Sequence, residues 1–273
     1  MTPPSASHSA PAAGAVALHI QPVAAFRDNY IWLLERGGRV AVVDPGEAVA
    51  VLQLLAARQW RLDTILLTHH HSDHVGGVSD LVRAHPARVY GPANSPFDAI
   101  DVRLREGDSV AVLGTTFSVM TVPGHTLDHI AYWSAEQAAV FCGDTLFACG
   151  CGRLFEGSAA QMAASLGRLG ALPGDTRVYC AHEYTLSNLR FALAVEPGNT
   201  DLQQRREECV ELRERGLPTV PSTIALERAT NPFLRCEMPA VQAAARNHQP
   251  DAVGTPADPV GVFGVLRGWK DRY

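Results

Sequence analysis

The sequence has no block of lysine and arginine, and its charge is modest for its length. It carries 23 basic and 28 acidic residues among 273, a formal net charge of -5. Nucleic-acid-binding proteins usually show a basic patch, so this balance argues against such a partner. Long hydrophobic runs are missing too, because no stretch reaches the roughly 18 consecutive apolar residues of a membrane helix. We therefore expect neither a nucleic acid nor a membrane as a partner.

Cysteines are few, and their spacing does not indicate a disulfide framework. The chain has six, which in a protein of this size is typical of reduced thiols in the cytoplasm. Cys149 and Cys151 form a close pair, but a metal or redox motif usually needs a second pair. We expect structural or incidental roles for these two cysteines, and we expect a cytoplasmic protein.

The first sixteen residues are rich in proline, alanine and serine. They lack the basic start and the continuous apolar segment of a secretory signal. We expect residues 1–16 to form a disordered tail, with a divergent targeting segment as the alternative.

The sequence does contain ordinary amounts of hydrophobic residues, 47%, in alternating strand-like and helix-like segments. Short runs rich in β-branched residues recur between residues 17 and 181, and helical periodicity occurs at 47–60, 75–85 and 158–172. Interleaved strands and helices predict a layered α/β domain over 17–183. From about residue 184 the pattern becomes helical and poor in strands, which predicts a second, helical domain over 184–273.

The segment THHHSDH, residues 68–74, concentrates metal-binding side chains directly after a predicted buried strand. Imidazole nitrogens and carboxylate oxygens suit zinc, iron or manganese. An extended turn sends alternate residues to one side, so we expect His69 and His71 to meet one cation, and Asp73 and His74 another. His70 is out of phase, and we expect it to point outward in a structural role.

One loop cannot complete two coordination shells, so we expect further donors at other strand ends. His125 follows a strand and a Pro–Gly turn, Asp144 ends another strand, and His182 ends the last one. Their recurrence at strand exits places them on one rim of the sheet. A carboxylate there can bridge two cations about 3.5–4 Å apart.

This order of donors resembles the metallo-β-lactamase superfamily, and the resemblance implies an αββα sandwich over roughly Ala17 to His182. It implies that His69, His71 and His125 hold one metal, that Asp73, His74 and His182 hold the other, and that Asp144 bridges them. It also implies that Asp44, in VVDPGEA, supports the ligand histidines through hydrogen bonds. Without the resemblance, Asp44 is a turn residue.

Later stretches resemble one family more specifically, glyoxalase II or hydroxyacylglutathione hydrolase: DNYIWLL, PGHTLDHI, FCGDTLFACGCGRLFEG, CAHEYTLSNLRFA, ATNPFLR and FGVLRGWKD. The resemblance implies a monomer that hydrolyses S-lactoylglutathione to lactate and glutathione, the second step of methylglyoxal detoxification. The attacking group is a hydroxide shared by two divalent metals, zinc by preference, with iron and manganese as alternatives. Asp73 and Asp144 are then the catalytic carboxylates, and 184–273 is the glutathione-binding domain.

The same resemblance implies a set of glutathione contacts: Arg153, Phe155, Tyr184, Arg267 and Lys270. The last two are three residues apart, which puts them on one helical face. Without the resemblance, they are solvated charges near a chain end. Three positions depart from the family pattern: Arg153 stands where lysine is common, Phe155 where tyrosine is common, and Asp128 where glycine is usual.

Other functions of the same fold remain as alternatives. A persulfide dioxygenase uses one iron and is shorter at its C-terminus, a nuclease relative adds basic surface, and a β-lactamase is usually secreted. A non-catalytic metal-binding scaffold predicts a broken donor set, whereas all seven donors are present in this chain.

Overall fold

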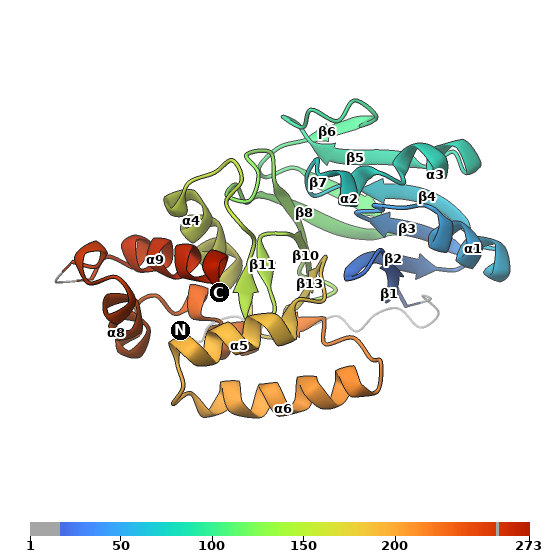
Figure 1. Ribbon diagram of the computed structural model, residues 1–273. Helices are drawn as coiled ribbons and strands as arrows, with labels where there is room; N and C mark the ends of the chain where they lie inside the picture. The colour runs from blue at the N-terminus through green and yellow to red at the C-terminus, as the bar shows by residue number, and fades with distance from the viewer. Residues whose placement is uncertain (1–16, 255–256) are drawn as a thin grey trace, which may run out of the picture.

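The computed structural model describes residues 17–254 and 257–273, so the tail expected over 1–16 lies outside the described residues. Two six-stranded sheets form the body of the molecule (Figure 1). The first sheet has the order β1-β2-β3-β4-β5-β6. Its strands are β1 (His19–Ala25), β2 (Asn29–Arg36), β3 (Arg39–Val43), β4 (Arg61–Leu66), β5 (Arg88–Pro92) and β6 (Val102–Leu104).

The second sheet has the order β14-β13-β10-β9-β8-β7. Its strands are β7 (Ser109–Val112), β8 (Thr115–Thr121), β9 (Ile130–Ser134), β10 (Ala139–Gly143), β13 (Arg177–Cys180) and β14 (Ser222–Thr223). A separate small hairpin joins β11 (Leu146–Phe147) to β12 (Gly150–Cys151).

Strand direction brings the functional loops to one edge of both sheets. β3 and β4 run parallel, so the turns that follow them leave at the same end. In the second sheet β10 runs parallel to β13, and β8 shares their direction because β9 is antiparallel to both of its neighbours. An isolated bridge between Asn29 and His182 ties the two sheets together at this edge.

The alternation of side chains along β2 explains the layering. Tyr30, Trp32 and Leu34 belong to the core that includes the second sheet. Ile31 and Leu33 point to the opposite face and join the core formed with α1 and α3. Because successive strand residues face opposite sides, one continuous apolar strand supplies both cores.

Four helices accompany the sheets: α1 (Val49–Arg58), α2 (Ser72–Val75), α3 (Val78–Ala84) and α4 (Ala159–Gly170). Figure 1 shows α1 and α3 outside the first sheet and α4 on the far side of the second, the expected αββα arrangement. The helix expected over 75–85 is confirmed as α3, but it begins at Val78, because Gly76 and Gly77 separate it from α2. A Cβ atom at Gly76 would lie 2.6 Å from the carbonyl oxygen of Gly46, so the two backbones meet closely there.

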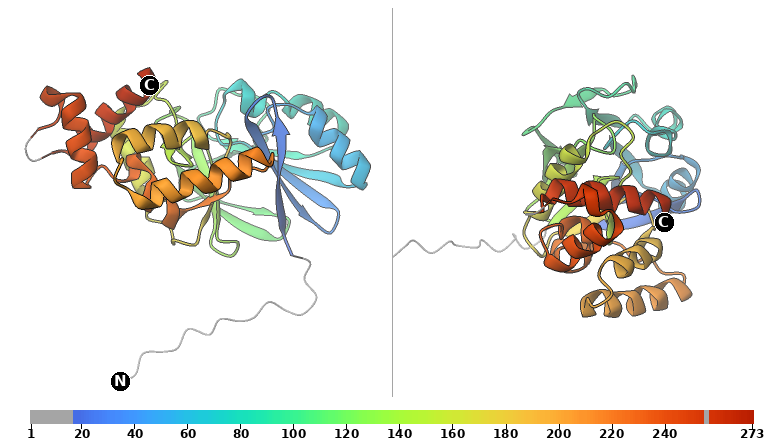
Figure 2. Two further views of the ribbon diagram at one scale, coloured as in Figure 1. Left: turned by 60° about the horizontal axis from the view of Figure 1, so that its bottom comes forward. Right: turned by 60° about the vertical axis from the view of Figure 1, so that its left-hand side comes forward.

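The C-terminal region is mainly helical, as expected. Its elements are α5 (Thr185–Val195), α6 (Thr200–Glu214), α7 (Ile224–Thr230), η1 (Pro232–Leu234), α8 (Pro239–His248), η2 (Pro250–Ala252) and α9 (Pro259–Arg272). These helices lie together beside and below the second sheet in Figure 1, and Figure 2 shows them from two other sides. β14 also comes from this region, a strand that the sequence did not reveal because two residues show no periodic pattern. Within the described residues, no helix is both long enough and apolar enough to cross a membrane.

Candidate metal centre and substrate pocket

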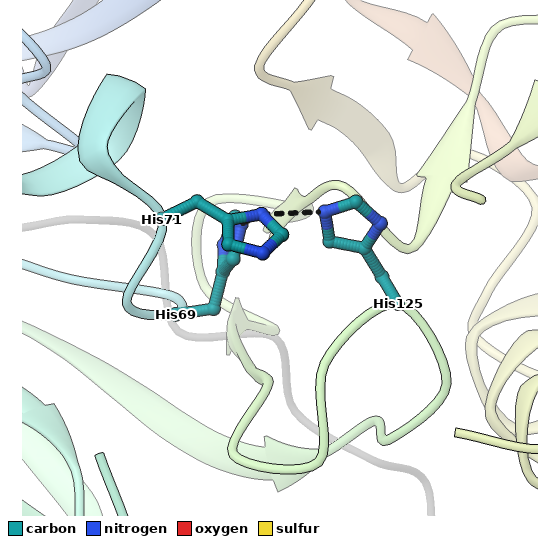
Figure 3. A group of neighbouring side chains, drawn as sticks. All are labelled: His69, His71 and His125. Carbon is teal, nitrogen blue, oxygen red and sulfur yellow. Dashed lines mark hydrogen bonds between the residues drawn. The ribbon is translucent and has the colours of Figure 1, made fainter. Parts of the chain in front are cut away.

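The first group of donors combines the loop after β4 with the loop between β8 and β9. The ring nitrogens of His69, His71 and His125 lie within 4.8 Å of one another. His71 presents its Nδ1, which is 3.2 Å from Nε2 of His69 and 3.0 Å from Nε2 of His125. Figure 3 shows His69 and His71 from one loop facing His125 from another.

The second group lies beside the first and combines α2 with the end of β13. Asp73 Oδ2 is 3.6 Å from Nε2 of His74 and 3.6 Å from Nε2 of His182. We expected an extended turn in which alternate residues point to one side. This applies to His69 and His71 at the start of the loop but not to Asp73 and His74. Asp73 and His74 are positioned by the short helical turn of α2.

Asp144, directly after β10, lies between the two groups. Its Oδ2 is 3.4 Å from Nε2 of His125, in the first group. Its Oδ1 is 3.5 Å from Nε2 of His74 and 3.3 Å from Nε2 of His182, in the second. All seven donors named from the sequence thus converge on one place.

The donor set fits a pair of divalent cations. Two of its buried atoms, Nε2 of His74 and Oδ1 of Asp144, have no hydrogen-bond partner among the described residues. Buried polar atoms are normally paired, so a lone pair directed into a cluster of other donors is the arrangement expected of a metal ligand. Five imidazoles and two carboxylates are also the ligand chemistry that zinc, iron and manganese accept.

Asp44 holds the loop after β4 from behind, as the resemblance implied. Its Oδ2 lies 3.1 Å from Nδ1 of His74 and accepts a 2.7 Å hydrogen bond from the hydroxyl of Thr68. Its Oδ1 accepts a 2.7 Å bond from the backbone N–H of Thr68, whose Oγ1 lies 3.1 Å from Nδ1 of His69. Asp44 itself has a φ of 52°, an unusual conformation for a residue with a side chain.

Other donors are held by residues that the sequence analysis did not single out. Nδ1 of His182 lies 3.1 Å from the carboxylate of Asp28, and Asn29 donates a 3.1 Å hydrogen bond to Oδ2 of Asp73. Nδ1 of His125 donates to the backbone carbonyl of Arg153 at 2.9 Å. Asp28 and Asn29 belong to DNYIWLL, a stretch quoted for the resemblance without a role for either residue.

His129 is a further buried histidine of the centre. Its Nε2 accepts a 3.1 Å hydrogen bond from the backbone N–H of Asp144, and its ring stacks on that of His69 with centroids 4.6 Å apart. Burial, and then the neighbouring His125, hold the pKa of His129 well below its usual range, so the ring stays neutral and its Nε2 can accept. The close contact with Gly143, whose φ is +47°, leaves no room for a Cβ atom there.

Burial and neighbouring side chains shift the pKa values of the buried donors. Burial lowers the pKa of His69 well below the usual range, which favours the neutral imidazole that binds metals. Burial raises the pKa of Asp144, but His74, His182 and His125 outweigh it and hold that pKa well below its ordinary value. Asp144 is therefore a carboxylate, the form that can bridge cations.

His70 does not belong to either donor group. Its Nδ1 lies 3.0 Å from Asp128 and its Nε2 lies 3.5 Å from Glu156. Asp128 also accepts a 2.7 Å hydrogen bond from the hydroxyl of Thr126. The extra negative charge of Asp128 is thus paired with His70, which is half-buried rather than fully outward.

A cavity of about 740 Å³ opens beside the donors. All five residues named from the sequence as glutathione contacts line it: Arg153, Phe155, Tyr184, Arg267 and Lys270. The structure adds others that the sequence analysis missed: Ser187, Asn188, Arg190, Asp271 and Tyr273. A larger cavity of about 910 Å³ lies between α5, α6 and α8, but none of the named site residues lines it.

Aromatic rings connect the cavity to the donors. The ring of Tyr184 stacks on that of His182 with centroids 4.6 Å apart and planes within 6°. Phe155 meets His71 and His125 edge-on at 5.5 and 5.2 Å. Phe155 therefore packs against the first donor group, with 63% of its surface exposed.

Two basic residues of α9, Arg267 and Lys270, line the cavity. Arg267 is only 5% exposed and donates to the carbonyl of Cys151 at 2.9 Å and to Asp271 at 3.0 Å. Lys270 donates to the carbonyl of Ser187 at 3.2 Å, which links α9 to α5. All six cysteines are free and buried, and neither Cys149 nor Cys151 belongs to a donor group.

The chain is similar to known proteins over most of its length. The family model of the metallo-beta-lactamase superfamily matches residues 25–182, and the model of the hydroxyacylglutathione hydrolase C-terminus matches residues 183–273. A hydroxyacylglutathione hydrolase from Pseudomonas aeruginosa is 56% identical over 94% of this chain and 100% of its own length. One from Cupriavidus metallidurans is 53% identical over 94% of this chain and 99% of its own.

Solved structures support the fold. The BLEG-1 B3 metallo-beta-lactamase superposes with a TM-score of 0.60 at 23% identity, covering 80% of this chain and 99% of that one. TTHA1623 in a di-iron-bound form superposes with a TM-score of 0.58 at 29% identity, covering 78% of this chain and 100% of that one. The fold and the matched C-terminal region agree. The chain belongs to the hydroxyacylglutathione hydrolase family, with a metallo-β-lactamase fold continued by that family's C-terminal region.

Proposed function

We propose that this protein hydrolyses the thioester of S-lactoylglutathione, and of related S-2-hydroxyacylglutathiones, to the hydroxy acid and glutathione. One observation carries the proposal: two groups of metal donors share Asp144 and open into a cavity lined by arginine and lysine. Metal ions held by these donors would activate a water for attack on a carbonyl. The arginine and lysine side chains would bind a leaving group that carries carboxylates. Hydrolysis of lactoylglutathione is the second step of methylglyoxal detoxification.

We further propose that His69, His71 and His125 hold one divalent metal, that Asp73, His74 and His182 hold another, and that Asp144 touches both. When bound, such a pair lowers the pKa of a shared water towards about 7 and polarises a carbonyl oxygen. Zinc is our first choice, with iron or manganese as alternatives. A di-iron form is recorded for the related TTHA1623.

The chain's own residues supply orientation. Asn29 fixes Oδ2 of Asp73 at 3.1 Å, so that this carboxylate faces both His74 and His182 and can orient the attacking oxygen. Asp28, Thr68 and Asp44 hold the outer nitrogens of the histidines and fix their tautomers. The thiol released has an ordinary pKa near 8.5, so the thiolate leaves without a separate acid.

The cavity supplies recognition. In our proposal Arg153, Arg267 and Lys270 bind carboxylates of the glutathione portion, and Tyr184 donates a hydrogen bond to its backbone. Phe155 offers the substrate an exposed apolar ring beside the donors. Residues 184–273 form the glutathione-binding part of the protein, which acts as a cytoplasmic monomer with reduced cysteines.

The direct test is hydrolysis of S-lactoylglutathione by the purified protein, with metal analysis of the same sample. We expect rapid loss of the thioester absorbance and two metal ions per chain. A β-lactam and glutathione persulfide serve as control substrates for other activities of this fold. Turnover of either control in place of S-lactoylglutathione, or full activity with one metal per chain, would contradict the proposal.

A further inference from the structure

His70 lies between two proposed metal donors in the sequence, but its side chain does not join them. His69 and His71 belong to the first donor group, whereas His70 turns towards two carboxylates. Its Nδ1 lies 3.0 Å from Oδ1 of Asp128, and its Nε2 lies 3.5 Å from Oε1 of Glu156. The function proposed above gives none of His70, Asp128 and Glu156 a role.

Asp128 is closely connected to the third donor of that group, His125. The hydroxyl of Thr126 donates a 2.7 Å hydrogen bond to Oδ1 of Asp128, and this bond closes the turn between the two residues. The backbone N–H of Gly124 donates to the carbonyl of Thr126 at 3.0 Å. Thr126 and Asp128 are both buried, so a movement of Asp128 would move His125 as well.

Glu156 is attached to the same turn. Its Oε2 accepts a 2.7 Å hydrogen bond from the backbone N–H of Leu127. Nδ1 of His125 donates to the carbonyl of Arg153 at 2.9 Å, which joins the two segments a second time. They therefore form one unit that carries His125. We call it the His125 unit, and it comprises residues 124–128 and 153–156.

The first donor group is therefore built from two separate parts of the chain. His69 and His71 belong to the loop after β4, and the third donor belongs to the His125 unit. His71 and His125 are 54 positions apart in the sequence, yet their nearest ring nitrogens are 3.0 Å apart. The fold must therefore hold two loops against each other with some accuracy to form this group.

Neutral imidazoles in this arrangement repel one another. The metal-binding form of histidine is the neutral ring, which presents a lone pair on the coordinating nitrogen. Nδ1 of His71 lies 3.2 Å from Nε2 of His69 and 3.0 Å from Nε2 of His125, so three such lone pairs converge on one small volume. Contacts outside the group have to hold the rings together before a cation binds, and preorganised ligands bind more tightly.

Asp128 is kept in its position at a cost to stability. Its Oδ2 is buried and has no hydrogen-bond partner among residues 17–254 and 257–273. An unpaired buried carboxylate oxygen destabilises a folded protein, so core packing alone does not explain a carboxylate here. Its other oxygen, Oδ1, is the one that accepts from Thr126 and faces His70.

We propose that His70 is a positioning residue for the first metal. Its contacts with Asp128 and Glu156 hold the loop after β4 against the His125 unit, so that the three histidines of the first group are in place before a cation binds. This inference rests on the proposed function, which assigns those three histidines to one metal.

The test measures zinc affinity in an Asp73→Asn background, where the first group should hold the one remaining ion. Metal-free protein is titrated with zinc in competition with a chromophoric chelator. We expect His70→Ala and Asp128→Ala each to raise the zinc dissociation constant by about 10-fold, and the double variant to lose little more than either. Asp128→Asn keeps the accepting oxygen and should stay within about 3-fold of the background.

Control variants separate positioning from a general loss of structure. His85→Ala removes a histidine directly after α3, and Asp80→Ala removes a surface carboxylate paired with Arg83; neither should change the zinc affinity. The melting temperature of the metal-free protein should change by only a few degrees in His70→Ala, because that side chain is already 22% exposed. Glu156→Gln, at a more exposed carboxylate, should give a smaller loss of zinc affinity than His70→Ala.

In the chain that retains Asp73, His70→Ala should weaken the binding of one of the two ions and not the other. Equal weakening of both ions, unchanged zinc affinity in His70→Ala, additive losses in the double variant, or equal losses in Asp128→Asn and Asp128→Ala would overturn the inference. Each of these results leaves the proposed hydrolysis standing. If His70→Ala weakens one ion but the wild type does not hydrolyse S-lactoylglutathione, the positioning role stands and the proposed reaction fails.

Discussion

Asp73 differs from the other proposed donors of its group because its side chain is 40% exposed, whereas His74 and His182 are buried. Its removal therefore costs little packing, and its role can be tested with little change in stability. The hydrogen bond from Asn29 fixes its orientation, and a neutral amide at this position would still accept that bond.

We expect Asp73→Asn to lower kcat for S-lactoylglutathione by about 100-fold or more, because one donor group loses its anionic ligand. Metal content should fall towards one ion per chain, and the melting temperature should change by only a few degrees. Steady-state kinetics, metal analysis and thermal unfolding on one preparation measure all three. Asp63→Asn, at a carboxylate paired with Arg61 on β4, is the control; wild-type turnover in Asp73→Asn would contradict the two-metal mechanism.

Lys270 gives the pocket a dependence on pH. Its pKa is lowered to about 8 by burial and by Arg267, Arg190 and Arg153, with Cys151 acting in the opposite direction. A carboxylate ligand favours the charged amine, so the affinity for glutathione derivatives should be constant below about pH 8. It should weaken as the pH rises above that value and the lysine loses its proton.

Titration calorimetry with S-methylglutathione between pH 7 and pH 9 measures this loss, because that ligand has no titrating thiol. In Lys270→Arg the site stays charged and the dissociation constant should be nearly independent of pH over this range. A dissociation constant that rises equally in both proteins would assign the titration to another group.

At the scale of elements, a buried ion pair joins the C-terminal helices to the wall of the cavity. Arg205 on α6 and Glu227 on α7 are 2.6 Å apart and almost fully buried. Glu227 also accepts a 2.8 Å hydrogen bond from the backbone N–H of Cys149, in the turn between β11 and β12. Asn231, directly after α7, donates to the carbonyls of Phe147 and Gly150 in the same hairpin.

This network fixes the hairpin against the metal centre. Phe147 meets the rings of His182 and Tyr184 edge-on at 5.8 and 5.4 Å. The carbonyl of Cys151, at the end of β12, accepts a hydrogen bond from Arg267. Displacement of the hairpin would therefore disturb both the donors and the substrate pocket.

Removing one partner of the buried pair should be costly. We expect Arg205→Met to lower the free energy of unfolding by about 3–5 kcal/mol, because Glu227 would keep an uncompensated buried charge. The double variant with Glu227→Gln should recover part of this loss. Urea unfolding of the wild type, both single variants and the double variant gives the coupling energy, and additive effects of the two changes would show that the pair is not coupled.

At the scale of the whole molecule, the metal centre spans both sheets. His69, His71, Asp73 and His74 follow β4 of the first sheet. His125, Asp144 and His182 follow strands of the second. Among direct contacts at this edge, the indole of Trp32 on β2 donates to the carbonyl of Cys180 on β13 at 2.9 Å. Each of the two donor groups combines residues from both sheets, so a metal bound to either group would cross-link the two layers.

Metal removal should accordingly destabilise the whole fold. A ligand present at about 1,000 times its dissociation constant stabilises the folded state by about 4 kcal/mol, which for a chain of this size is a shift of roughly 8–16 °C in melting temperature. We expect chelation to produce a decrease of this order and reloading with zinc to reverse it. Scanning calorimetry measures the change, and an unchanged melting temperature in a demonstrably metal-free sample would contradict the cross-link.

The sequence by itself was enough to name the candidate donors and their order, because metal ligands need particular side chains and these can be read directly from the sequence at the ends of predicted strands. It also determined the layered α/β region and the helical region after residue 184, whose periodic patterns are long. The hairpin of β11 and β12 and the strand β14 escaped prediction, since two-residue strands have no period to detect.

Only the tertiary structure decided which distant residues complete the site. Asp28 reaches His182 across 154 positions of sequence, and His129 supports Asp144 through a backbone contact. In the sequence Arg190 is an ordinary helical arginine, and it lines the cavity only because α9 packs against α5. Contacts of this kind depend on how two sheets and two helices pack, and packing is set by the whole set of buried side chains rather than by any local pattern.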